Sequence, residues 1–176
     1  MTGTLVNTAL VIAGSLAGLA LRRKGIPDNI KHIIMTGLGI FTCVLGLKMG
    51  FDMTNPLFVV LSLVLGGLVG TLLRVEDLVE NIGLKLRKVC SFKEEVSFAR
   101  AFVTASILFS IGPMTIIGCV QDGLLHKPDL LIVKSLMDGI SAIILASSLG
   151  SGTLFSAIVV FAFQGSITLL AGQLKF

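Results

Sequence analysis

Six long apolar stretches dominate this chain and decide what it can fold into. The last of them, residues 153–170, contains no charged side chain. A helix of about 20 apolar residues crosses the roughly 30 Å hydrocarbon core of a bilayer. Hydrophobic residues make up 54% of the chain and charged residues only 14%, whereas charged residues are about a quarter of an ordinary soluble domain. The chain is therefore predicted to be a membrane protein.

The predicted spans leave only short loops between them. They lie at residues 4–21, 33–47, 57–73, 98–120, 129–149 and 153–170. The expected fold class is all-α, a polytopic transmembrane helical bundle of about six spans that forms a single transmembrane domain over residues 1–176. The first span runs into "RRKG" instead of a small-residue cleavage site, so we expect it to be retained.

Basic residues are unevenly distributed between the loops. Most of them lie in the loops at residues 22–32 and 74–97: Arg22, Arg23, Lys24, Lys31, Arg74, Lys85, Arg87, Lys88 and Lys93. The opposite side has only Lys48, Lys127 and Lys175. Because Lys and Arg accumulate in cytoplasmic loops, we expect both basic loops to be cytoplasmic and the N-terminus to face out. The net charge of +4 then reflects topology, and no nucleic-acid partner is expected.

The loop at residues 74–97 has a helical pattern of its own. Its apolar residues recur at helical spacing, with acidic residues early and basic residues late: Val75, Leu78, Val79, Ile82, Leu86 and Val89. This order suits the helix dipole. We expect an amphipathic helix on the cytoplasmic surface, either coupling the two halves of the protein or binding a partner or lipid.

Two stretches of the chain resemble two others 73 residues further on. "GIFTCVLGLKMG" at 39–50 matches "GPMTIIGCVQDG" at 112–123, and "SLVLG" at 62–66 matches "SLMDG" at 135–139. Internal repeats are common in transporters. The matches predict a weak repeat of spans two and three in spans four and five. Chance resemblance is the alternative, because Gly, Ser, Thr and Leu are common in membrane helices.

Two charges interrupt the fifth span. Lys134 and Asp138 lie four residues apart in "IVKSLMDGISAII", on one face of the helix. At the bilayer centre each would cost about 2.5 to 3.5 kcal/mol if it faced lipid, so both must face protein or water. The pair is either an internal ion pair that locks helix packing or a solute, ion or proton site in which the two groups exchange partners.

The fourth span has a predicted break at Gly112 and Pro113. Proline removes one backbone hydrogen bond and clashes with the preceding turn, so backbone groups near Thr115 would need protein cover at depth. Broken helices often form transporter sites, while a packing kink or a re-entrant segment are the alternatives. Gln121 and Asp122 are expected at the outer edge, at a solvated helix end.

Other polar or small residues lie inside the spans. Asn7 and Gln164 are expected to hydrogen-bond between helices or to line the same cavity as the charges. Two ladders of small residues, Gly14 to Gly18 and Gly66-Gly67-x-x-Gly70, fit close helix packing, with or without formation of a homo-oligomer.

Motifs for other chemistries are missing from the sequence. No phosphate-binding loop, nucleophile elbow or zincin motif occurs, so no ATP-driven pump or standard intramembrane enzyme is expected. The three cysteines and two histidines have no metal-ligand spacing. We therefore expect neither an enzyme nor a cofactor nor a metal site.

The stretches "LFSIGPMTIIGCVQDGL", "LLIVKSLMDGISAIILASSLGSGTLFSA" and "FQGSITLLAG" closely resemble the domain of unknown function 554 family, the YqgA/YdfK-like bacterial inner-membrane proteins. The resemblance covers nearly the whole chain. It implies a multi-pass protein of the plasma (inner) membrane that is often described as a transporter, with no established substrate. Family members usually continue beyond "LLAGQL" through at least one further hydrophobic segment.

The expected function combines these features. We expect a transporter or channel for a small solute or ion, surrounded by membrane lipid. Its site would lie among Gly112, Pro113, Thr115, Lys134, Asp138, Gln164 and Asn7. Asp138 would accept a cation or proton, and Lys134 would be its releasable counter-charge. The alternative is a non-transporting scaffold or regulatory protein in which Lys134 and Asp138 form a structural ion pair.

Overall fold

The described part of the chain is helical. The computed structural model describes residues 1–22, 25–52, 56–74 and 95–173, and it contains no strand in these ranges. The helices are α1 (Thr2–Arg22), α2 (Asp28–Phe51), α3 (Pro56–Leu72), α5 (Glu95–Ser110), α6 (Pro113–Leu125), α7 (Asp129–Leu149) and α8 (Gly152–Gln173). The all-α class is therefore confirmed. Nearly all of the surface helix predicted in the loop at residues 74–97 lies outside the described residues.

Four helices are long and apolar enough to cross a membrane, namely α1, α2, α7 and α8. A fifth candidate span is the bent pair α5 and α6, whose axes differ by 56°. The helix α3 contributes a shorter apolar segment, Val59–Leu72. A helical membrane bundle is thus supported, while the sixth span and the internal repeat stay predictions.

The chain groups into two compact units. One comprises Met1–Ile26 and Ile82–Phe176, and the other comprises Pro27–Asn81. The second unit contains α2 and α3, and α2 has no buried residue. The first unit contains α1 and α5 to α8 and holds the buried core. The prediction of one domain over the whole chain stays untested.

Glycines hold α1 and α7 in a close parallel contact. A Cβ added to Gly14 would lie 2.2 Å from the carbonyl oxygen of Gly139, and one added to Gly18 would lie 2.3 Å from that of Ile143. The predicted Gly14 to Gly18 ladder is therefore a packing surface. The other predicted ladder, at Gly66, Gly67 and Gly70, has no described atom within 4 Å of an added Cβ, so the described residues show no close packing there.

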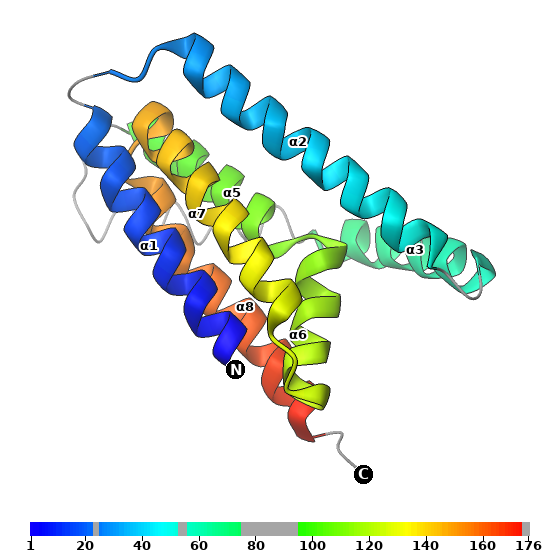
Figure 1. The fold of residues 1–176 in the computed structure, drawn as a ribbon. Helices are drawn as coiled ribbons and strands as arrows, with labels where there is room; N and C mark the ends of the chain where they lie inside the picture. Colours follow the sequence, from blue (N-terminus) through cyan, green and yellow to red (C-terminus); the bar gives the residue numbers. More distant parts are fainter. Residues whose placement is uncertain (23–24, 53–55, 75–94, 174–176) are drawn as a thin grey trace. The chain divides into compact units, whose positions relative to one another are not determined.

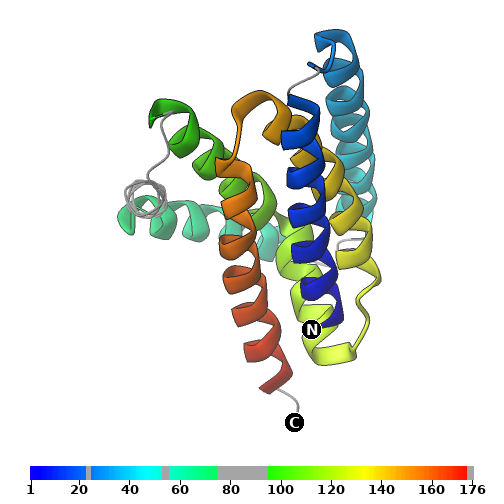
Figure 2. The same cartoon turned by 90° about the vertical axis from the view of Figure 1, so that its left-hand side faces the viewer.

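The helix α8 returns along α1 in the opposite direction (Figures 1 and 2). The turn from α7 into α8 uses Gly150 at a φ of 101°, which glycine adopts without strain. A hydrogen bond of 3.2 Å joins the hydroxyls of Thr4 and Thr168. Val11 and Val160 meet in one buried cluster. Successive turns of α1 and α8 are therefore matched in register.

The bent pair α5 and α6 crosses the full length of α8. A Cβ on Gly152, at the start of α8, would lie 2.2 Å from the Phe98 carbonyl oxygen in α5. At the other end, a Cβ on Gly123 in α6 would lie 2.5 Å from the Thr168 carbonyl oxygen in α8. The pair therefore lies along α8 within the first unit, and both alternatives for it, a broken span and a re-entrant segment, stay predictions.

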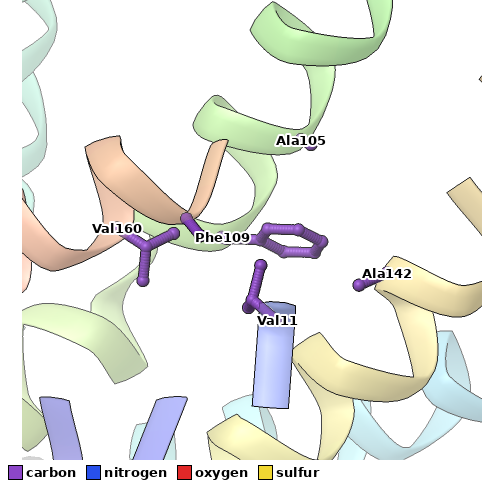
Figure 3. Packing of buried hydrophobic residues seen from close by; sticks show 6 residues of the cluster. Val11, Ala105, Phe109, Ala142 and Val160 are labelled. Carbon is purple, nitrogen blue, oxygen red and sulfur yellow. The ribbon is translucent and has the colours of Figure 1, made fainter. Parts of the chain in front are cut away.

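A small apolar cluster lies in the middle of the bundle. Figure 3 shows the Phe109 ring among the side chains of Val11, Ala105, Ala142 and Val160, which come from four helices. Ala157 completes the cluster, and Leu145 packs against it. These residues form one apolar layer, which we call the central layer.

Candidate functional site

The break between α5 and α6 occurs where the sequence predicts it. The helix α5 ends at Ser110 and α6 begins at Pro113, with Gly112 in an extended conformation (φ −163°, ψ 149°). In an unbroken helix the N–H of residue 113 would donate to the carbonyl of Phe109, four residues earlier. Proline has no N–H, so the Phe109 carbonyl needs another donor.

Lys134 supplies that donor from α7. Its Nζ donates to the Phe109 carbonyl oxygen at 2.8 Å, and the Thr115 hydroxyl donates weakly to the same oxygen at 3.4 Å. The same ammonium forms an ion pair with Asp138. Lys134 and Asp138 are 6% and 7% exposed, so the charges are sheltered by protein, as their depth requires.

Asn7 joins this network from α1. Its amide nitrogen donates to Asp138 Oδ2 at 3.0 Å. The structure therefore brings together Asn7, Lys134, Asp138 and Thr115, four of the predicted site residues. Gly112 and Pro113 contribute the break that exposes the carbonyl. We call this group the charge network.

Gln164 lies close to the same level but is not bonded to the network. It is fully buried, and neither of its amide atoms has a partner within the described residues. Its place on α8 is between Thr168, which pairs with Thr4, and Val160, which meets Val11. Asn7 lies between Thr4 and Val11 on α1. The matched register therefore puts Gln164 opposite Asn7.

Asp122 was wrongly predicted to lie at a solvated helix end. It is 2% exposed, and its Oδ2 accepts a hydrogen bond from the Gly3 N–H at 3.0 Å and lies 3.1 Å from the amine of Met1. A helical pattern in the sequence could have revealed this. Thr115, Gly118, Cys119 and Asp122 share one face of α6, and all four are buried.

Polar groups thus follow one another from one end of the bundle to its middle. Asp122 lies beside Gly3, the threonine pair comes next on α1 and α8, and Asn7 with Asp138 follows one turn further. Beyond Asn7 the interior changes at once, because Val11 belongs to the central layer. We call this row of polar groups the polar ladder. It leads to the charge network and stops at apolar side chains.

Metal ligands do not gather at this site. Among the described residues, no three His, Cys, Asp or Glu side chains lie close enough to hold a metal ion. The chemistry available is hydrogen bonding, ion pairing and proton transfer. The only charged side chains in the network are Lys134 and Asp138, whose charges cancel.

Comparisons with known proteins agree with a membrane assignment. The family model described as "Protein of unknown function (DUF554)" matches residues 2–176. "Uncharacterized membrane protein YdfK" of Bacillus subtilis (strain 168) is 34% identical over 175 residues, covering 97% of this chain and 73% of that protein. "Uncharacterized protein YqgA" of Escherichia coli (strain K12) is 26% identical over 152 residues, covering 84% of this chain and 64% of that protein. No solved structure matches the chain significantly.

Proposed function

This chain belongs to the DUF554 family of membrane proteins of unknown function, and we propose that it is a transporter or channel for a small solute or ion. The observation that carries the proposal is the link between Pro113, the Phe109 carbonyl, Lys134 and Asp138. A helix break and two buried charges meet at a single point inside the bundle. Intramembrane ionisable groups and broken helices both mark substrate pathways.

Asp138 is the acceptor for a cation or proton in this proposal. In the present arrangement its Oδ2 interacts with both Lys134 and Asn7. A proton or cation arriving at this carboxylate neutralises it and weakens the attraction that holds Lys134. The Lys134 ammonium then keeps the Phe109 carbonyl as its acceptor. Lys134 is thus a counter-charge that can be released without losing every partner.

The polar ladder supports a route from one end of the bundle to Asp138. It begins at Asp122, beside Gly3, and reaches Asn7 within about one turn of α1. The central layer, which includes Phe109 and Val11, lies beyond Asn7 on this route. A polar route that meets an apolar layer suits alternating access, in which the layer parts only when the other end is closed.

The membrane orientation follows from the basic loops. With the loops at residues 22–32 and 74–97 in the cytoplasm, the N-terminus faces out and the inner membrane is the location. Asp122 lies beside Gly3, so the polar ladder then begins at the outer face. In this proposal the solute or ion therefore enters the polar ladder from the outer face.

Flux in proteoliposomes tests this proposal. Purified protein is reconstituted with a trapped pH indicator, and proton flux is followed under an imposed membrane potential, alone and with a panel of small polar solutes. Asp138→Asn and Lys134→Met variants that elute as folded protein are compared with the wild type. The proposal expects their flux to fall to that of protein-free vesicles. Unchanged flux in both folded variants contradicts it.

The alternative is a membrane scaffold or regulatory protein. One observation favours it: Lys134 and Asp138 satisfy each other, with Phe109 and Asn7 completing the network, as a structural lock would require. This alternative predicts that the wild type moves no solute or proton and that both variants only lose thermal stability. Flux in the wild type that depends on Asp138 excludes it.

A further inference from the structure

The amide of Gln164 is a buried polar group that forms no hydrogen bond with the charge network. The side chain is fully buried, and both Nε2 and Oε1 are without a hydrogen-bond partner in the described part of the chain. Burying an unpaired amide opposes folding. A methionine of similar length would fill the same place without that penalty.

Asn7 presents a second unpaired atom at the same level. Its amide nitrogen is held by Asp138 Oδ2, so the orientation of the amide is set and its Oδ1 is directed elsewhere. That oxygen also has no partner among the described residues. The register of α1 and α8, marked by the pair of Thr4 and Thr168, places Asn7 and Gln164 opposite each other.

The atoms that remain free define the chemistry of a ligand. Two carbonyl oxygens can accept hydrogen bonds, and the Gln164 amino group can donate them. The adjacent charges of Lys134 and Asp138 cancel each other, so the network offers no net attraction for an ion while the pair is closed. A matching ligand is therefore uncharged and carries donors and an acceptor side by side.

The geometry points to a binding site for an uncharged amide- or urea-type solute between Asn7 and Gln164, beside the Lys134 and Asp138 pair. This inference rests on the proposed transport function and names the substrate class of that site. Asn7 connects the two parts, since one end of its amide faces Asp138 and the other is free for the solute. Protonation of Asp138 then weakens its hydrogen bond with Asn7, and Asn7 can reorient with the solute.

Solute flux with matched glutamine variants tests the inference. Proteoliposomes are mixed rapidly with a concentrated solution of urea, acetamide or glycerol, which makes them shrink. The rate at which they swell again as the solute enters is followed by light scattering. Gln164→Met removes the buried amide. Gln173→Met makes the same change at an exposed position of the same helix. We expect the wild type and Gln173→Met to speed the entry of urea and acetamide, and Gln164→Met to match protein-free vesicles.

Thermal unfolding of the same variants separates a binding role from a structural one. If the Gln164 amide has no partner, Gln164→Met leaves Tm unchanged or raises it by about 2–4 °C. A lower Tm for Gln164→Met than for Gln173→Met means that the amide is bonded within the protein, and it overturns the inference. A wild type that speeds only water, or neither urea nor acetamide, also overturns it.

The two proposals fail in different ways. Urea and acetamide flux that survives Gln164→Met but is lost in Asp138→Asn removes the amide site and leaves the proposed transport function standing. Flux lost in Gln164→Met but unchanged in Asp138→Asn keeps the amide site and removes the assigned role of Asp138. Urea and acetamide flux that neither variant alters removes both the amide site and the assigned role of Asp138, although the flux itself still supports a transport function.

Discussion

Two stretches of similar sequence have different structures in this protein. Residues 39–50 form part of the continuous helix α2, whereas residues 112–123 contain the break that begins α6. The position of Pro113 in the second stretch is Ile40 in the first, and the positions of Lys134 and Asp138 are Leu61 and Leu65. Proline and the two charges therefore occur together within residues 112–138 and are absent together from the corresponding residues 39–65.

The comparison teaches that the break and the charges depend on each other. Where Ile40 keeps the helix intact, no carbonyl is left without its backbone donor, and the neighbouring span has no lysine to supply one. Where Pro113 frees the Phe109 carbonyl, Lys134 occupies it. The two corresponding threonines differ in the same way. The Thr42 hydroxyl donates to the Leu38 carbonyl, four residues earlier, while the Thr115 hydroxyl donates across the break to the Phe109 carbonyl.

Removing one charge alone should have the largest effect on stability. Lys134→Leu leaves the Asp138 carboxylate buried without its counter-charge, which costs about 3–5 kcal/mol. Changing both residues to leucine, as in α3, leaves only neutral groups unpaired and should cost less, about 1–3 kcal/mol. Thermal unfolding in detergent measures both. A double variant less stable than Lys134→Leu would contradict the assignment of a buried ion pair.

Alanine at matched glycines should distinguish the packed helix from the exposed one. At Gly14 a Cβ meets the Gly139 backbone at 2.2 Å, and Gly14→Ala should destabilise by about 1–3 kcal/mol. At Gly37 in α2 an added Cβ meets no described atom within 4 Å. Gly37→Ala should therefore stabilise by up to about 1 kcal/mol. Equal losses of Tm would mean that α2 is packed as closely as α1.

Restoring the missing N–H should have opposite effects in two backgrounds. In the wild type, Pro113→Ala offers Phe109 a backbone donor that competes with Lys134, and we expect a loss of about 1 kcal/mol. In the double leucine variant the carbonyl has lost Lys134, so the same change should restore a bond and raise Tm by about 2–4 °C. A change of the same sign in both backgrounds would disprove the role of the freed carbonyl.

The two corresponding threonines, Thr115 and Thr42, give the smallest expected difference in stability. Thr115→Val removes a long hydrogen bond from a buried oxygen and should cost about 0.5–1.5 kcal/mol. Thr42→Val removes a local bond at an exposed position and should change stability by a few tenths of a kcal/mol at most. Denaturation curves recorded side by side would show this order, and the reverse order would place Thr42 in a packed environment.

Much of the fold could be predicted because its causes are local. Apolar length sets the spans, Pro113 sets the break, and the spacing of Lys134 and Asp138 sets their pairing. The bounds predicted for the fifth span, residues 129–149, agree with α7. The predicted second span, residues 33–47, is shorter than α2, which contains Asp28 and Lys48 near its ends. A search for uncharged windows assigns charged residues at helix ends to the loops.

The partners of the polar residues could not be predicted, because they depend on helix register. The position of Asp122 beside Gly3 follows from the way α6 packs against α1. No residue near Asp122 in the sequence indicates that Gly3 is its partner. The same holds for Asn7, whose bond to Asp138 joins residues far apart along the chain. Gln164 was predicted to be buried, and its lack of a described partner appears only when its neighbours are known.

The most direct test of the account is flux through the variant that carries leucine at both charge positions, Lys134→Leu with Asp138→Leu. The double variant resembles α3 at these positions, and its folding can be verified by thermal unfolding before reconstitution. The account predicts a folded protein whose proton and solute flux equals that of protein-free vesicles. Wild-type flux through the folded double variant would contradict it and leave Lys134 and Asp138 with a structural role.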